Sequence, residues 1–266
     1  MDSKLDTLKT CLREHAPIVI AYSGGVDSAC LLAVAHETLG PERMLGVIAD
    51  SPSLPRQALT DALAVAKQIG APVEVVRTDE MQDENYVSNP LNRCYFCKAE
   101  LFTKLDQLAR ERGYAAIAYG ENADDANHFR PGSKAAAEFS ILAPLRHAEI
   151  TKAEVREISR AFGLPTAEAP SQPCLSSRIP HGTPVTQGAL AMIEQGEAYV
   201  RSLGFKVFRV RHLVDDDAAA KYRARVQIAP EEMGGIASRE AALVSGLGAV
   251  GYAAVEIDTA GYRSPA

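Results

Sequence analysis

The sequence predicts an α/β protein with a doubly wound, mostly parallel sheet, followed by a smaller C-terminal α+β domain. Between residues 17 and 163, short apolar runs alternate with segments of helical period. Strands separated by helices pair in parallel through right-handed crossovers, and this pairing gives a doubly wound sheet. A glycine-rich turn, residues 23–28, joins the first expected strand to the first expected helix. After Gly163 the alternation stops, and a helix, two strands, a helix and a last strand follow a proline-rich segment.

The expected strands of the first part are short apolar runs at 17–22, 44–50, 72–78 and 114–120. The expected helices of this part end at glycine, and they lie at 28–40, 55–70, 97–113 and 151–163. Thr151 and Glu154 form the pattern of a capping box at the start of the last of these helices. In the second part, we expect helices at 188–204 and 230–250 and strands at 205–213, 222–229 and 252–261.

These elements divide the chain into three parts. Residues 1–165 form the sheet domain, residues 166–184 form a linking loop, and residues 185–266 form the small domain. Residues 164–185 hold five prolines and little periodicity, and long loops in compact proteins are often functional. Within the sheet domain, we expect ligands at the carboxyl ends of the parallel strands.

Composition and charge argue against nucleic acid and membrane as binding partners. The 266 residues are 47% hydrophobic and 23% charged, and the formal net charge is −6. A negative net charge argues against nucleic-acid binding through a broad cationic surface, so we expect no stable nucleic-acid complex. No apolar run reaches the roughly 18 residues of a membrane span. The charged N-terminal segment lacks the apolar core of a signal peptide, so we expect a cytoplasmic protein.

The turn SGGVDS, residues 23–28, has the composition of a phosphate-binding loop. A strand that enters a glycine-rich turn and leaves as a helix points backbone N–H groups at one spot, where the helix N-terminus adds a positive potential. Ser23 and Ser28 can donate hydroxyl hydrogen bonds to phosphate oxygens. Asp27 would repel phosphates unless it binds Mg²⁺. A helix cap without a ligand is the alternative interpretation of the same spacing.

SGGVDS after a first strand resembles the PP-loop of the ATP pyrophosphatase superfamily, which includes NAD, GMP and asparagine synthetases and tRNA thiolation enzymes. No Gly-Lys-Ser/Thr follows, so the turn is not a Walker A loop. The resemblance implies an adenine nucleotide α-hydrolase-like fold and cleavage of ATP between the α and β phosphates, with Asp27 as a catalytic residue. The residues expected to bind ATP are Ala21, Ser23, Gly24, Gly25, Val26, Asp27, Ser28, Gly120 and Asn122.

Five cysteines make an odd number. In a reducing compartment such thiols are more commonly buried, metal-bound or reactive than joined in disulfides. Cys11 and Cys30 lie among apolar residues of helical segments and are expected in the core. Cys94 and Cys97 have a C-x-x-C spacing just before an expected helix, and Cys174 lies in the linking loop.

The thiolates of Cys94, Cys97 and Cys174 allow several kinds of chemistry. They are one short of a closed zinc site, but they can hold a [4Fe–4S] cluster with one iron left open to an external ligand. His181 either supplies a fourth ligand or is a solvated loop residue. Exchange of the C-x-x-C pair as a disulfide is a further possibility.

Several motifs together resemble the LarE family: RCYFCK at 93–98, GENADD at 120–125, RPG at 130–132, TKAEVR at 151–156 and PCLSSRIPHGT at 173–183. The similarity extends from about Ile18 to Ile257. Members of this family are ATP-dependent sulfur transferases that make a nickel-pincer nucleotide cofactor. The resemblance implies a small-molecule substrate, pyridinium-3,5-biscarboxylic acid mononucleotide. Its carboxylates are adenylated with release of pyrophosphate and then converted to thiocarboxylates.

The family resemblance leaves the sulfur source open between three routes. Some members sacrifice the sulfur of one loop cysteine and lack the C-x-x-C pair, whereas others carry three cysteines that bind a [4Fe–4S] cluster for sulfide delivery. Because Cys94, Cys97 and Cys174 are all present, this chain matches the second group. These three are the expected catalytic and cluster-binding residues. The alternatives are a sacrificial Cys174 and a thiol pair that passes persulfide sulfur.

Polar residues after the fourth expected strand are candidate helpers of the ATP chemistry. Asp124 and Asp125 either assist Mg²⁺ or start a turn. Arg130 and Lys134 either stand beside the leaving pyrophosphate or belong to a solvated basic turn.

Arg209 and Arg211 lie two residues apart on an expected strand and therefore face the same side. Arginine pairs bind phosphate with a fixed geometry, which suits the 5′-phosphate of a mononucleotide. Ion pairs with the acidic run 215–217 are the alternative. The LarE resemblance implies a substrate-phosphate site made of Ser177, Arg178, Glu197, Arg209 and Arg211. The family tends to carry glutamate where Gln227 stands, so a metal or acid–base role there is in doubt.

Three hypotheses of function follow. The leading one is a sulfur transferase that uses ATP and Mg²⁺, takes sulfur from sulfide or a cysteine desulfurase, and forms homo-oligomers. An amide-forming PP-loop ligase of the NAD or GMP synthetase type would use the glycine turn but not the three cysteines. A non-catalytic ATP-binding or cluster-carrying partner protein in cofactor assembly is the third.

Overall fold

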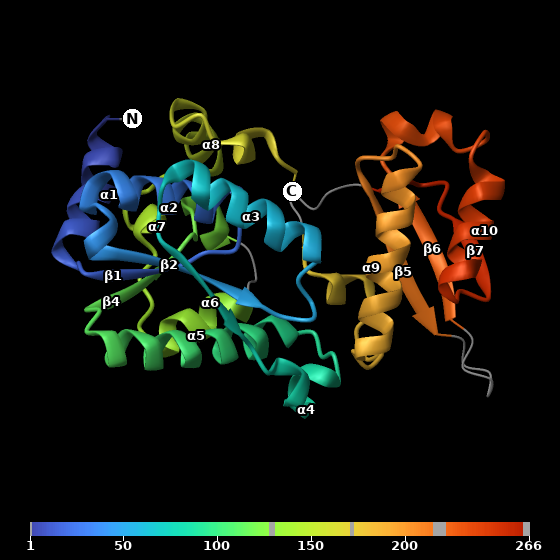
Figure 1. Cartoon of the computed structure of the whole chain (residues 1–266), viewed down its shortest axis with the longest axis horizontal. Coiled ribbons are helices and arrows are strands. Elements are labelled where there is room, and N and C mark those ends of the chain that lie inside the picture. Colours follow the sequence, from blue (N-terminus) through green and yellow to red (C-terminus); the bar gives the residue numbers. More distant parts are fainter. Residues whose placement is uncertain (1, 128–130, 171–172, 215–221, 263–266) are drawn as a thin grey trace. The chain divides into compact units, whose positions relative to one another are not determined.

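The computed structural model describes residues 2–127, 131–170, 173–214 and 222–262. The chain divides into two compact units. The first consists of Met1–Asp83 and Asn92–Gln172, and the second of Glu84–Leu91 and Pro173–Ala266. Figure 1 labels most helices and strands of both units.

The first unit contains the predicted parallel sheet. Its strands are β1 (Ile18–Ala21), β2 (Met44–Asp50), β3 (Val73–Arg77) and β4 (Ala116–Tyr119). They lie in the order β3-β2-β1-β4, and every neighbouring pair is parallel. Because β1 has β2 on one side and β4 on the other, the direction of winding reverses beside β1. This is the position at which open α/β sheets bind ligands.

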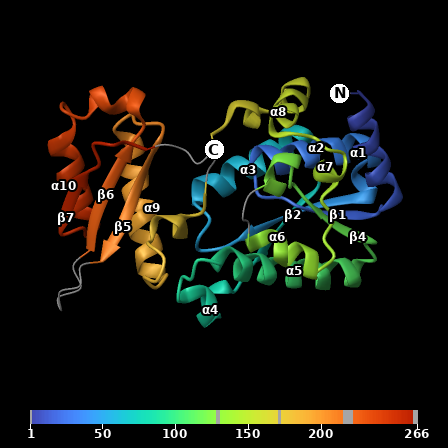
Figure 2. The ribbon, with the colours of Figure 1, turned by 180° about the vertical axis from the view of Figure 1, so that it is seen from behind.

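Helices cover both faces of this sheet, as Figures 1 and 2 show. One face packs against α1 (Asp2–Glu14), α2 (Val26–Leu39), α3 (Arg56–Ile69), α7 (Pro144–His147) and α8 (Lys152–Ala161). The other face packs against α5 (Arg93–Arg112) and α6 (Pro131–Glu138). The fold is therefore the predicted doubly wound α/β class.

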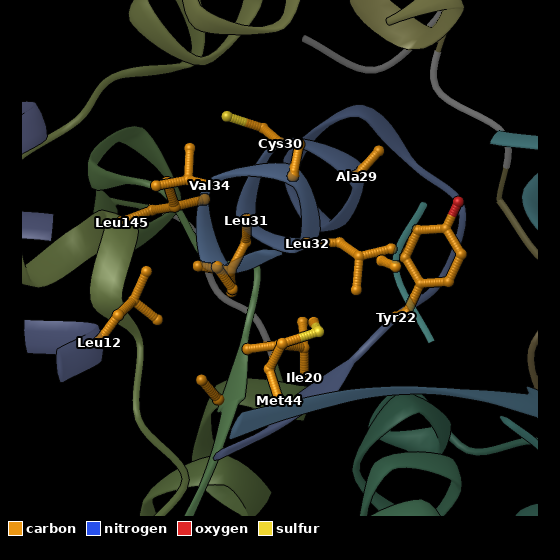
Figure 3. Close-up of a cluster of buried hydrophobic side chains, with 14 of the residues drawn as sticks. Leu12, Ile20, Tyr22, Ala29, Cys30, Leu31, Leu32, Val34, Met44 and Leu145 are labelled. Atoms are coloured by element: carbon orange, nitrogen blue, oxygen red, sulfur yellow. The ribbon is translucent and has the colours of Figure 1, made fainter. Parts of the chain in front are cut away.

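Side chains of β1 alternate between the two cores. Ile20 packs in the cluster that contains α2, whereas Val19 packs in the cluster that contains α5. Figure 3 shows Leu31 and Leu32 of α2 beside Ile20 and Met44. All of these side chains are fully buried, so β1 packs against side chains on both faces of the sheet.

The two cysteines expected in the core are buried. Cys11 lies in α1 and Cys30 in α2. Burial raises the pKa of the Cys30 thiol to about 12. Both therefore serve as small apolar side chains.

The second unit is the predicted small α+β domain. It contains α4 (Glu84–Val87), α9 (Gln187–Ser202), β5 (Phe208–Val214), β6 (Tyr222–Ile228), α10 (Glu240–Val250) and β7 (Ala254–Ile257). The sheet order is β5-β6-β7, with β5 and β6 antiparallel and β6 and β7 parallel. Phe208 and Val210 of β5 share one core with residues of α9 and α10.

The structure differs from the expected elements in three places. The expected helix over 230–250 is interrupted, because a 3-10 turn ends at Gly235 and α10 begins only at Glu240. The basic stretch after residue 130 forms α6, which buries Ala135 and Ala136 against α5. The C-x-x-C pair does not precede a helix but lies inside the first turns of α5.

None of the described helices has both the length and the apolar character needed to cross a membrane.

The second unit contains a buried histidine, His212. The His212 ring is 1% exposed and lies against Tyr222 and Tyr252, at 4.7 and 5.6 Å between ring centroids. Its Nε2 atom has no hydrogen-bond partner in the part of the chain that the structure describes. Burial lowers the pKa of His212 from 6.5 to about 4. The folded state therefore keeps the ring neutral, while the unfolded chain takes up a proton below pH 6.5.

We predict that the stabilising contribution of neutral His212 is complete above pH 6.5 and is lost as the pH falls toward 4, by about 3 kcal/mol. Urea unfolding of the wild type and of His212→Phe at several pH values measures this contribution. The difference in unfolding free energy between the two proteins should change across this window and be constant above it. A constant difference at all pH values would contradict the prediction.

Candidate functional site

The glycine turn lies where the first strand ends, and Ser28 holds its shape. The Ser28 hydroxyl donates to Gly25 O at 3.0 Å, accepts from Ser23 N at 3.1 Å and lies 3.0 Å from the Ser23 hydroxyl. Ser23 and Gly25 are exposed, whereas Val26 and Ser28 are buried. The N–H groups at the start of α2 have no partner within the helix, so the turn has the chemistry of an anion site.

Two glycines allow this turn to pack closely against its surroundings. Gly24 has φ +78°, and a Cβ there would stand 2.6 Å from Ala62 Cβ. A Cβ on Gly120, directly after β4, would stand 2.7 Å from Ser28 N and 2.9 Å from Asp27 C. Neither position accepts a larger residue without moving the turn. The sequence therefore needs glycine at 120 as well as in the turn itself.

Four polar side chains close a ring at the carboxyl edge of the sheet. Asp27 Oδ1 accepts from Asn122 Nδ2 at 3.1 Å, and Asp27 Oδ2 accepts from Lys152 Nζ at 2.6 Å. Asn122 Oδ1 accepts from Asp124 N at 2.9 Å, and Asp124 Oδ2 accepts from Lys152 N at 2.8 Å. The capping box of Thr151 and Glu154 is present and fixes the start of α8, which carries Lys152. The ring joins the glycine turn, the segment after β4 and α8.

A buried carboxylate supports the segment after β4. Glu121 is 3% exposed and accepts hydrogen bonds from the hydroxyls of Tyr119 and Ser133. It also forms an ion pair with Arg146 Nη1 at 2.8 Å. Burial, reinforced by Glu121, raises the pKa of Tyr119. Glu121 thus fixes the position of its neighbours Gly120 and Asn122.

The remaining polar candidates of the first unit have structural partners. Asp124 and Asp125 accept hydrogen bonds from the backbone N–H groups of Lys152 and Asn122, as residues that start a turn do. Lys134 is 74% exposed and lies 3.8 Å from Glu138 on α6. Arg130 lies outside the described residues.

The C-x-x-C pair lies on one face at the start of α5, because residues three apart on a helix are neighbours. Cys94 is exposed and Cys97 is partly buried. The next residue, Lys98, lies with its ammonium group 4.7 Å from the centroid of the Tyr119 ring. The pair therefore lies at the start of a long helix, with one thiol exposed and the other partly buried.

In the second unit, Arg178 holds the Cys174 loop. It is 3% exposed and makes a two-pronged ion pair with Glu197, at 2.8 and 2.9 Å. Its Nη1 donates to Pro173 O, to Cys174 O and to the Ser177 hydroxyl, at 2.7, 3.0 and 2.9 Å. These contacts orient the backbone on both sides of the Cys174 thiol.

The Cys174 thiol itself is partly buried. Its Sγ lies 3.2 Å from the Ser176 hydroxyl, which accepts from the Tyr86 hydroxyl at 3.1 Å. His181 is exposed in the same loop.

Two further arginines lie beside this pair. Arg211 donates to Ser177 O at 2.7 Å, and the Arg209 guanidinium lies 4.4 Å from the centroid of the Tyr262 ring. Burial and the nearby Arg178 lower the pKa of both Arg209 and Arg211. The five residues expected at the substrate phosphate are thus gathered in one unit, and the acidic run 215–217 lies outside the described residues.

The described residues supply two of the three cysteine ligands of the expected iron–sulfur cluster from one unit. Cys94 and Cys97 offer two thiolates to one metal centre, while Cys174 belongs to the second unit. In the described ranges, no three His, Cys, Asp or Glu side chains are grouped so that they could hold a metal ion. The pair fits half of a ligand set, and a complete set is not found among those residues.

Sequence reasoning missed several residues that the structure places in these sites. The sequence places Lys152 at the first position of a helix, beside the capping Thr151. It gives no sign that the ammonium group reaches Asp27. Glu121 and Arg146 meet only through tertiary structure. Tyr262 lies beyond the last strand and reaches Arg209 through the turn that follows β7.

The chain resembles known proteins over its whole length. Residues 4–129, which contain the glycine turn and the segment after β4, match the NAD synthase family. An uncharacterised protein of Synechocystis sp. is 40% identical over 266 residues, which cover 99% of this chain and 96% of that protein.

Two relatives that are named for an activity differ in how much of the chain they match. The NH₃-dependent NAD⁺ synthetase of Pyrobaculum aerophilum is 44% identical over 62 residues, 23% of this chain and 22% of that protein. The pyridinium-3,5-bisthiocarboxylic acid mononucleotide synthase of Lactiplantibacillus plantarum is 29% identical over 262 residues, 98% of this chain and 92% of that protein. With its glycine turn, its cysteine loop and this extent of similarity, the chain belongs to the LarE family of PP-loop enzymes.

Proposed function

We propose that this enzyme adenylates a carboxylate of pyridinium-3,5-biscarboxylic acid mononucleotide and then replaces AMP by sulfur, which gives a thiocarboxylate. The observation that carries the proposal is the polar ring around Asp27 beside the glycine turn. It occurs in a chain that is similar over 98% of its length to a synthase of the bisthiocarboxylic acid mononucleotide.

The nucleotide would bind at the glycine turn. The exposed Ser23 and Gly25 and the N-terminus of α2 offer donors to phosphate oxygens. A substrate carboxylate oxygen attacks the α-phosphorus, the bond from that phosphorus to the bridging oxygen breaks, and pyrophosphate leaves. The product is an acyl adenylate, in which the carboxylate charge that resists nucleophiles has been removed.

Sulfur transfer then completes the reaction. A sulfide nucleophile attacks the acyl carbon, the bond from that carbon to the AMP oxygen breaks, and AMP leaves with both electrons. The sulfide proton goes to water, so the products are a thiocarboxylate and AMP. Arg209 and Arg211 would hold the 5′-phosphate of the mononucleotide throughout.

The residues at the glycine turn fit Mg²⁺. Asp27 is one-fifth exposed at its side chain, and magnesium prefers carboxylate oxygens together with substrate phosphates. Bound there, the ion would neutralise charge on the phosphates. Asn122 and Lys152 each hold one oxygen of the Asp27 carboxylate and so fix it at the end of the glycine turn.

For the sulfur source, we propose a [4Fe–4S] cluster held by Cys94, Cys97 and Cys174, which would supply sulfide. The C-x-x-C spacing of Cys94 and Cys97 at the start of α5, with Cys94 exposed, supports this route. A sacrificial Cys174 and persulfide transfer by the thiol pair are the competing routes.

We further propose that the enzyme works in the cytoplasm as a homo-oligomer and takes its sulfur from sulfide or from a cysteine desulfurase. An odd number of cysteines leaves at least one thiol outside any intramolecular disulfide, and unpaired thiols are common in a reducing compartment.

An amide-forming ligase is the second candidate function. It is favoured by the match of residues 4–129 to the NAD synthase family. A ligase would use the glycine turn and the polar ring but would leave the cysteines without a role.

Pyrophosphate release distinguishes the two functions. We expect ATP to give AMP and pyrophosphate only when the pyridinium dicarboxylate mononucleotide is added, with thiocarboxylate formed when sulfide is supplied. Nicotinic acid adenine dinucleotide with ammonia is the matched alternative substrate. Turnover with that pair and none with the mononucleotide would replace the transferase by a ligase, and no turnover with either would indicate a non-catalytic partner protein.

Gly120→Ala tests the nucleotide site. The added Cβ would press on the backbone of Asp27 and Ser28, so we expect kcat/KM for ATP to fall about a hundredfold, the cost of a misplaced catalytic group. Gly188→Ala is the control, because a Cβ there meets nothing closer than 4.0 Å, and it should keep wild-type kinetics. Equal ATP kinetics of Gly120→Ala and the wild type would remove the glycine turn from the active site.

Cysteine variants identify the sulfur source. With a cluster, anaerobically purified protein should contain iron and absorb broadly in the visible range, and each chain should turn over repeatedly. Cys94→Ser, Cys97→Ser and Cys174→Ser should each lose iron and thiocarboxylate formation while pyrophosphate release continues. Loss of one H₂S from Cys174 after a single turnover, with Cys94→Ser still active, would favour sacrifice instead.

A further inference from the structure

The side chain of Gln227 lies between two charged residues of the second unit, Arg211 and Asp258. It lies on β6, directly opposite Arg209 in the antiparallel register with β5. Its Oε1 accepts from Arg211 Nε at 2.8 Å, and its Nε2 donates to Asp258 Oδ2 at 2.8 Å. The amide therefore joins a guanidinium to a carboxylate without direct contact between the two charges.

Only one orientation of this amide satisfies both neighbours. Turned over, the Nε2 group would face the Arg211 donor and the Oε1 atom would face the Asp258 acceptor, which are two repulsive contacts. Asp258 is fixed by its own turn, because its Oδ1 accepts from Ala260 N at 3.0 Å. The hydrogen bond from Gln227, with that from Ala260, lowers the pKa of Asp258 and keeps it ionised.

The contacts of Arg211 leave its charge without a direct counter-charge in the described part of the chain. It donates to two neutral oxygens, Gln227 Oε1 and Ser177 O. Arg178, by contrast, is matched by Glu197. A half-buried guanidinium held in this way is oriented and still able to bind an anion.

A buried hydroxyl beside this cluster also points to a ligand. Tyr262 is 6% exposed, its ring contacts the Arg209 guanidinium, and its phenol oxygen has no hydrogen-bond partner in the described ranges. Buried hydroxyls in native proteins nearly always have a partner.

We propose that Gln227, held by Asp258, is a positioning residue that presents Arg211 to a phosphate monoester while keeping that arginine uncompensated. The proposal rests on the proposed function, because the phosphate is that of the substrate mononucleotide. A glutamate at 227 would form an ion pair with Arg211, would lose the donor to Asp258 and would place two carboxylates in contact.

Binding of nicotinic acid mononucleotide, compared with its riboside that lacks the phosphate, tests this role by calorimetry. We expect Gln227→Glu to raise the Kd of the mononucleotide ~10–100-fold at about pH 8, the effect of losing a charged hydrogen bond. The Kd of the riboside should not change. Glu256→Gln is the matched control, because Glu256 pairs with Arg225 on the same sheet without contact to Gln227.

The pH dependence separates positioning from damage to the fold. Among the described residues, the titratable and charged groups nearest position 227 are Arg209 and Arg211 on β5, Arg225 on β6, Glu256 on β7, and Asp258 and Tyr262 after it. Arg178 and Glu197 also act on Arg211. At about pH 5.5, one of the two touching carboxyl groups of Gln227→Glu should take up a proton. A protonated glutamate donates to Asp258 and accepts from Arg211 as glutamine does. Affinity relative to wild type at the same pH should then recover.

A double variant, Gln227→Glu with Asp258→Asn, should not recover at low pH, because its glutamate stays ionised beside Arg211. If Arg211→Ala loses phosphate-dependent affinity but Gln227→Glu binds like the wild type at both pH values, the positioning role is wrong and the phosphate site stands. If the wild type binds the mononucleotide no better than the riboside, the phosphate site and the positioning role both fail.

Discussion

The nucleotide half of this protein depends on the close approach of two backbones at Gly120. The segment after β4 lies against the turn after β1 so tightly that a single added carbon would stand 2.7 Å from Ser28 N. This approach brings Asn122 within hydrogen-bond distance of Asp27. Lys152 then completes the ring from α8. The absence of a side chain at Gly120 therefore allows three distant segments to meet at the Asp27 carboxylate.

The second unit solves a different electrostatic problem, because it buries several guanidinium groups in a small domain. Burial of an unmatched charge is costly. Arg178 is matched by Glu197, Arg209 lies against an aromatic ring, and Arg211 is held by neutral oxygens. Burial and the nearby Arg178 lower the pKa of Arg209 and Arg211.

The differences between expected and observed elements arise where tertiary packing or a glycine, and not the local apolar pattern, decides the secondary structure. The central strands β1, β2 and β4 were predictable because a buried parallel strand is a nearly unbroken apolar run between turns. The expected helix over 230–250 was interrupted around Gly235, a residue type that lowers helix stability. The α6 helix was missed because its short run, Pro131–Glu138, contains one turn of alanines and no long apolar period. Its stability comes from packing on α5.

The sequence by itself determined the doubly wound sheet, the glycine turn, the capping box of α8 and the cysteine and arginine candidates, because each is a pattern of neighbours along the chain. Only the tertiary structure decided that Lys152 meets Asp27, that Glu121 meets Arg146 and that Gln227 joins Arg211 to Asp258. These pairs are separated by many residues and meet only because strands and helices pack in one arrangement. Hydrogen bonds act over about 3 Å, so no spacing in the sequence can reveal them.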